Sequence, residues 1–194
     1  MNDALTLAGA TLIILSGAPY IIDVVRKKSH PNVVSWFTWT LLITIGAFAA
    51  MDAGETRTAI LTFADAAQVG LILLLGLKYG YAKFSLFDGI CQIGALAGLA
   101  LWLIFNSPTV AIIATITIDL IVALPTMRHS WLKPNEETWQ TYFLSGVGAT
   151  IGLFSLAAFS VDSYAYPLYV VLLGLTLSSV IVLRRKKMGL PLFR

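Results

Sequence analysis

Carboxylate side chains stand deep inside apolar segments of this 194-residue chain. Asp119 lies about ten residues into the segment 109–128, and Asp65 lies about eight residues into 57–78. Gln68 follows Asp65 by one helical turn, on the same face. A charged residue at the centre of a membrane helix costs roughly 2.5–3.5 kcal/mol, so each carboxylate needs a compensating environment. These residues are the candidates for a proton site or a substrate site.

The sequence offers these carboxylates no basic partner, because no Lys or Arg stands at a similar depth in any apolar segment. Three environments remain for them: protonation, a polar network, or a bound cationic ligand. The functional interpretation places Asp65 and Asp119 in a cavity along a transport path. The structural interpretation is a neutral or hydrogen-bonded aspartate that ties two helices together.

Aromatic residues and prolines form a second group of candidates. Trp36 and Trp139 open two apolar segments at the membrane interface, where aromatic belts are common. Because they occupy equivalent positions in an internal repeat, which is described below, they are also candidates for lining a cavity. Pro19 and Pro125 each remove a helical hydrogen bond, which predicts either a hinge or a static kink.

The amino-acid composition indicates which kind of secondary structure must position these residues. Apolar residues make up 58% of the chain and charged residues 12%, against about 25% charged in an average soluble domain. A membrane-spanning helix needs roughly 20 residues, and in lipid its backbone must satisfy its own hydrogen bonds. The sequence therefore predicts an all-α integral membrane protein with seven transmembrane helices, at 4–25, 33–51, 57–78, 84–105, 109–128, 137–158 and 164–184.

Basic residues are segregated between the loops. With seven helices, all of the Lys and Arg residues except Arg57 fall on one side of the membrane. The positive-inside rule places that side in the cytoplasm, so we expect the N-terminus outside and the C-terminus in the cytoplasm.

An internal repeat relates the two halves of the chain. When Pro31 is aligned with Pro134, five positions up to Leu41 are identical, and Trp39 falls on Tyr142. The first three helices then correspond to the last three, with one helix between them. Since three crossings and a linker helix restore the direction of the chain, the two triplets are expected to be parallel repeats.

This 3+1+3 layout, with a proline near the cytoplasmic end of the first and fifth helices, resembles the PQ-loop superfamily, which includes the SWEET sugar transporters. The defining Pro-Gln pair corresponds to Pro19-Tyr20 and Pro125-Thr126. The chain is most similar to bacterial PQ-loop-like proteins of unassigned function, which points to a bacterial inner membrane. The resemblance implies two three-helix bundles that alternate between inward- and outward-facing states.

These observations predict two bundles, 1–83 and 109–194, joined by a linker helix at 84–108. The expected function is small-solute transport by alternating access, with proton coupling through Asp119 and Asp65. The alternative is a non-transporting receptor or scaffold on the same fold. Expected partners are an unidentified small molecule and the lipid bilayer. The sequence is compatible with a homo-oligomer, and it indicates no nucleic acid, metal, cofactor or enzymatic activity.

Overall fold

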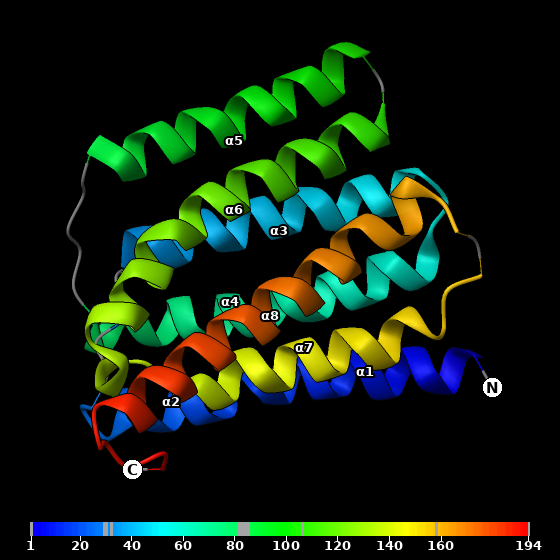
Figure 1. Cartoon of the computed structure of the whole chain (residues 1–194). Helices are drawn as coiled ribbons and strands as arrows, with labels where there is room; N and C mark the ends of the chain where they lie inside the picture. The colour runs from blue at the N-terminus through cyan, green and yellow to red at the C-terminus, as the bar shows by residue number, and fades with distance from the viewer. Residues whose placement is uncertain are drawn as a thin grey trace.

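The computed structural model describes residues 2–28, 31, 33–80, 86–105, 107–157 and 159–193. All regular elements within these ranges are helices (Figure 1). They are α1 (Asn2–Ser16), α2 (Ala18–Val25), α3 (Val33–Asp52), α4 (Thr56–Tyr79), α5 (Leu86–Phe105), α6 (Pro108–Leu132), the short 3-10 helix η1 (Pro134–Glu136), α7 (Trp139–Leu153) and α8 (Val161–Lys187).

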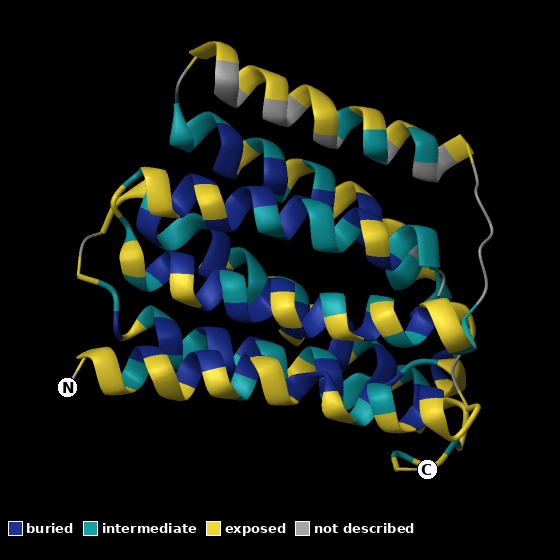
Figure 2. Ribbon diagram, turned by 180° about the vertical axis from the view of Figure 1, so that it is seen from behind, coloured by how far each residue is buried: buried dark blue, intermediate teal, exposed yellow. Residues whose placement is uncertain are grey.

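Five helical stretches in the described part of the chain are long and apolar enough to cross a membrane, which identifies an integral membrane protein. They are α1 with α2, α3, α4, α6 and α8. Helices suit this environment because each backbone N–H and C=O finds its partner within the same segment. Large apolar side chains on their outer faces are exposed, among them Leu74, Leu124 and Leu183. Figure 2 shows the buried residues gathered on the inner helices, with α5 exposed along its outer side.

The first membrane segment is interrupted at Gly17, between α1 and α2. Pro19 stands in the first turn of α2, where its missing N–H costs no helical hydrogen bond within α2. The interruption lies just before Pro19, where the sequence predicts a bend. In contrast, α6 continues without interruption through position 125 to Leu132. The side chain of Pro125 lies outside the described residues, and its role as a hinge stays a prediction.

The helices before α5 and the helices after it pack in the same order. Helix α4 packs between α1 and α3, and α8 packs between α6 and α7. Two further contacts, α1 with α7 and α3 with α6, join these triplets into a ring, and α4 touches α8 across it. Helix α5 lies outside this ring, against α6 and α3 (Figure 1).

Helix α7 is shorter than the predicted segment 137–158. It ends at Leu153, because the Ser155 hydroxyl donates to the Gly152 carbonyl at 2.6 Å and the Ser155 amide donates to the same oxygen at 2.9 Å. Both bonds use the Gly152 carbonyl, which in a continued helix would accept the amide of the residue four positions later. Helix α8 is longer than predicted: Ser160 caps its N-terminus and accepts the Ser163 amide at 3.2 Å.

Glycines bring the backbones of α1 and α7 into direct contact. A Cβ on Gly148 would lie 2.9 Å from the Gly9 carbonyl oxygen, and a Cβ on Gly9 would lie 2.9 Å from the Gly152 nitrogen. The pair Gly148 and Gly152 has the spacing of a small-xxx-small motif, which permits close helix packing. This contact joins the two helix triplets.

The two ends of the bundle differ in charge. All described Lys and Arg residues except Arg57 lie at the end where α2, α4, α6 and α8 finish, which we call the basic end. The opposite end, where α1 begins and where α3 and α7 finish, is called the outer end. The chain termini lie at opposite ends of the bundle (Figure 1).

We expect Gly148→Ala to destabilise the protein by about 1–3 kcal/mol, because the added methyl group meets rigid backbone of α1. Thermal unfolding in detergent measures the change. Gly94→Ala is the matched control, since its Cβ would lie at an ordinary 3.5 Å from Ile118. Equal stability of the two variants would contradict the close contact of α1 with α7.

Candidate functional site

A cavity of about 100 Å³ lies inside the ring of helices. It extends from the middle of the bundle toward the basic end, because its lining includes the early turns of α3 and α7, which begin at that end. Helices α3, α4, α6, α7 and α8 all contribute to it. The lining residues are Trp36, Trp39, Ile43, Asp65, Gln68, Val69, Asp119, Ala123, Thr141, Tyr142, Ser145, Tyr166, Tyr169, Val170, Leu173, Gly174 and Leu177.

Asp65 is held in the cavity wall by a tyrosine from the other triplet. The Tyr166 hydroxyl on α8 donates to Asp65 Oδ2 on α4 at 2.9 Å, and both side chains are buried. Such a bond to a carboxylate is stronger than one between neutral groups, and breaking it would leave a buried charge without a donor. The bond therefore positions Asp65 and links the third helices of the two triplets.

Asp119 has a less complete environment. It is 5% exposed, and its Oδ1 makes no hydrogen bond within the described structure. Trp39 and Tyr169 lie beside it, one from α3 and one from α8, and the Tyr169 hydroxyl also lacks a hydrogen-bond partner among the described residues. A buried, unpaired carboxylate oxygen that lines a cavity is a position where a proton, water or ligand can bind.

No described Lys, Arg or His lines the cavity. Arg57 lies at the outer end. Arg185 is buried at the basic end, where its guanidinium donates to the carbonyls of Pro134 at 2.9 Å, Glu137 at 2.6 Å and Leu192 at 2.7 Å. Asp65 and Asp119 therefore face the cavity without a basic side chain to balance them.

Polar contacts join the helices at the outer end. Arg57 on α4 forms a salt bridge with Asp3 on α1 at 3.0 Å and donates to the Ser155 carbonyl at 3.1 Å. Thr6 on α1 donates to the Ser155 hydroxyl at 2.8 Å. These bonds hold α1 and α4 against the end of α7, on the far side of the bundle from the cavity's extension.

Pro167 creates a further contact at the outer end, and sequence reasoning missed it. Because proline has no N–H, it leaves the Ser163 carbonyl, four residues earlier in α8, without its usual helical donor. The Thr58 hydroxyl on α4 donates to this carbonyl at 2.8 Å. A helix defect in the second triplet is thus satisfied by a side chain of the first.

Four of the residues predicted as a substrate or proton site lie together in the cavity lining: Asp65, Gln68, Asp119 and Trp36. The predicted hinge is adjacent, because a Cβ on Gly17 would lie 2.8 Å from Gln68 Cγ.

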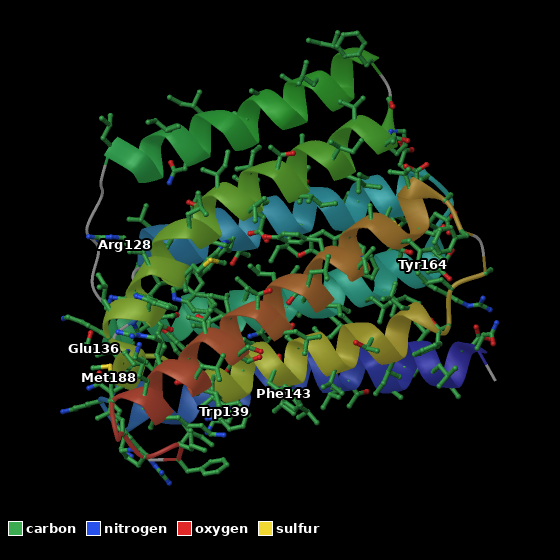
Figure 3. All side chains as sticks on the ribbon, viewed as in Figure 1. Arg128, Glu136, Trp139, Phe143, Tyr164 and Met188 are labelled. Carbon is green, nitrogen blue, oxygen red and sulfur yellow. The ribbon has the colours of Figure 1, made fainter. Side chains whose placement is uncertain are left out.

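Trp139 lies outside this cavity. Its indole N–H donates to the Leu192 carbonyl at 2.9 Å, and its ring packs against Phe143 and Phe193 at centroid distances of 6.0 and 5.6 Å. Figure 3 shows Trp139 and Phe143 on the side of α7 near the C-terminal tail. The C-terminal tail therefore packs against the indole ring of Trp139, which the internal repeat made a candidate for lining the cavity.

Several lining residues were not predicted as site residues. Trp39 and Tyr142 occupy equivalent repeat positions, and this alignment was the available signal for both of them. Tyr166 and Tyr169 stand three residues apart, on one face of α8. The described residues contain no group of three or more His, Cys, Asp or Glu side chains placed to hold a metal ion.

Comparisons with models of protein families, with curated proteins and with solved structures find no match for the chain. The cavity, the packing order of the helices and the repeated segments are therefore the observations from which a function is inferred.

We expect Thr58→Val to destabilise the protein by about 1–3 kcal/mol, because it leaves the Ser163 carbonyl buried without its donor. In a Pro167→Ala background the cost should shrink, since alanine restores the helical N–H. Thermal unfolding of both single variants and the double variant measures the coupling. Thr117→Val, at an exposed threonine bonded within its own helix, is the control. Strict additivity of Thr58→Val and Pro167→Ala would contradict the assigned role.

Proposed function

We propose that this protein is a small-solute transporter that works by alternating access, with proton coupling through Asp119 and Asp65. The observation that carries the proposal is the cavity between the two helix triplets, where two buried carboxylates have no basic partner among the described residues. A scaffold or receptor on the same fold would gain stability by filling this space with apolar side chains. A cavity near the middle of the bundle that is lined by two carboxylates is instead typical of the place where transporters bind their substrates.

The helix packing supports a parallel 3+1+3 repeat of the PQ-loop or SWEET type. In each triplet the third helix lies between the other two, and the contact of α1 with α7 corresponds to that of α6 with α3. Helix α5 is then the linker. Two similar bundles that meet along matched surfaces can rock against each other around a central site.

The charge distribution supports a cytoplasmic basic end and an outer end that faces away from the cytoplasm. The cavity extends toward the basic end, and Arg57, Thr6 and Thr58 join helices at the outer end. This arrangement corresponds to an inward-facing state in which the outer gate is closed. Opening it would require these polar contacts to separate while the basic end closes.

Proton coupling follows from the cost of enclosing a charge. A charged Asp119 favours a state in which water reaches the cavity, whereas a protonated Asp119 can be enclosed at lower cost. Protonation therefore favours closure of the basic end and passage to the outward-facing state. After release of the proton on the other side, the charged Asp119 would need a proton or a bound cation before the cavity could be enclosed for the return.

A cysteine at Ser145, in a Cys91→Ser background, tests which end gives access to the cavity. We expect a membrane-impermeant thiol reagent to label Ser145→Cys from the basic side, in inside-out vesicles. Asp52→Cys, at an exposed position near the outer end, should label from the opposite side. Labelling of Ser145→Cys from the outer side only, with Asp52→Cys behaving as expected, would overturn the inward-facing assignment.

The pH dependence of the same labelling tests the coupling residue. We expect labelling of Ser145→Cys from the basic side to slow several-fold on acidification, relative to a free thiol, because protonation favours closure. Asp119→Asn keeps the size of the side chain and removes its titration, so labelling should no longer slow on acidification. Asp52→Asn should leave this slowing intact. An unchanged pH dependence in Asp119→Asn would show that another group carries the coupling.

A further inference from the structure

The cavity lining combines two carboxylates with a group of aromatic rings. The rings are those of Trp36, Trp39, Tyr142, Tyr166 and Tyr169. Carboxylates attract cations, and the faces of Trp and Tyr rings attract alkylated ammonium groups in particular. An anion would meet two acidic groups here, in a lining to which no described basic residue contributes.

Asp119 is the carboxylate in this lining with an unsatisfied oxygen in the described structure. Asp65 already accepts the Tyr166 hydroxyl, whereas Asp119 Oδ1 is buried and makes no hydrogen bond in the described structure. Trp39 and Tyr169 lie beside Asp119 from two different helices. A cation at Asp119 would therefore meet a carboxylate and two aromatic side chains at once.

The size of the cavity limits the ligand. A water needs about 10–15 Å³ of such space, so the cavity of about 100 Å³ holds on the order of seven to ten water-sized groups. A small quaternary ammonium compound such as choline has about this number of non-hydrogen atoms. The many apolar lining residues suit its methyl groups better than the hydroxyls of a sugar, each of which would need a hydrogen-bond partner.

We propose that the cavity binds a small organic cation, with its ammonium group at Asp119 between Trp39 and Tyr169. This inference rests on the proposed transport function and names the substrate class of the same site. Cation and proton then compete for one carboxylate, so that arrival of one favours release of the other. This competition provides exchange of an organic cation for a proton.

The titratable groups that face the cavity are Asp65 on α4, Asp119 on α6, Tyr142 on α7, and Tyr166 and Tyr169 on α8. Helix α3 contributes Trp36, Trp39 and Ile43, which do not titrate. Acidification neutralises the carboxylates and removes their attraction for a cation. Binding of the cation is therefore expected to weaken as the pH falls.

The test uses choline and its neutral isostere 3,3-dimethylbutan-1-ol with the purified full-length chain in detergent. Binding is measured by tryptophan fluorescence and by calorimetry. We expect choline to bind and the isostere to bind at least about tenfold more weakly, since a charged interaction is lost. Asp119→Asn should weaken choline binding by a similar factor, and Trp39→Leu should also weaken it. Asp52→Asn is the matched control and should bind choline like the unmodified chain.

Thermal unfolding and gel filtration establish that each variant is folded. Equal binding of choline and the isostere, undiminished binding to folded Asp119→Asn, or absence of choline binding to the unmodified chain would each overturn the cation assignment. In those cases the proposed transport function would still stand if labelling of Ser145→Cys showed that the cavity alternates between open and closed at the basic end. Conversely, choline binding at Asp119 without any alternation would support the cation site and overturn transport.

Discussion

Hydrocarbon offers no hydrogen-bond partners, and this constraint determines how the helices of the protein face one another. A buried polar side chain is satisfied within its own helix, as Thr62 is by the Thr58 carbonyl, by another helix, or by the contents of a cavity. Asp65 is satisfied by Tyr166, and the carbonyl released by Pro167 is satisfied by Thr58. Both bonds cross from α4 to α8, so the third helices of the two triplets are held together by polar contacts, whereas α1 and α7 are held together by glycine packing.

The same constraint separates structural polar groups from those available for function. At the outer end, Arg57 binds Asp3 and the Ser155 carbonyl. Asp119 Oδ1, near the middle of the bundle, has no hydrogen-bond partner among the described residues and lines a cavity. In a membrane protein an ionisable group in this position is a candidate functional site. Under the proposed mechanism, closed contacts at one end and an incomplete site in the middle correspond to one state of an alternating cycle.

Much of this organisation could be predicted from local sequence. A carboxylate inside an apolar segment is conspicuous, so Asp65 and Asp119 were identified from their positions alone. What depends on non-local packing could not be predicted. Trp139 is covered by the C-terminal tail, although its repeat partner Trp36 lines the cavity. Tyr166 reaches Asp65 because the face of α8 that carries it packs against α4. Neither periodicity nor hydropathy predicts which neighbouring helix a given face of a membrane helix will contact.

The most direct test of alternating access is a distance measurement across the outer end, between spin labels at Met51 on α3 and Phe154 after α7. Both positions are exposed, and they belong to different triplets. In lipid nanodiscs, with Cys91 replaced by serine, alternating access predicts two distance populations, and the longer one should grow on acidification. A single narrow population that does not respond to pH would contradict the rocking of the two bundles.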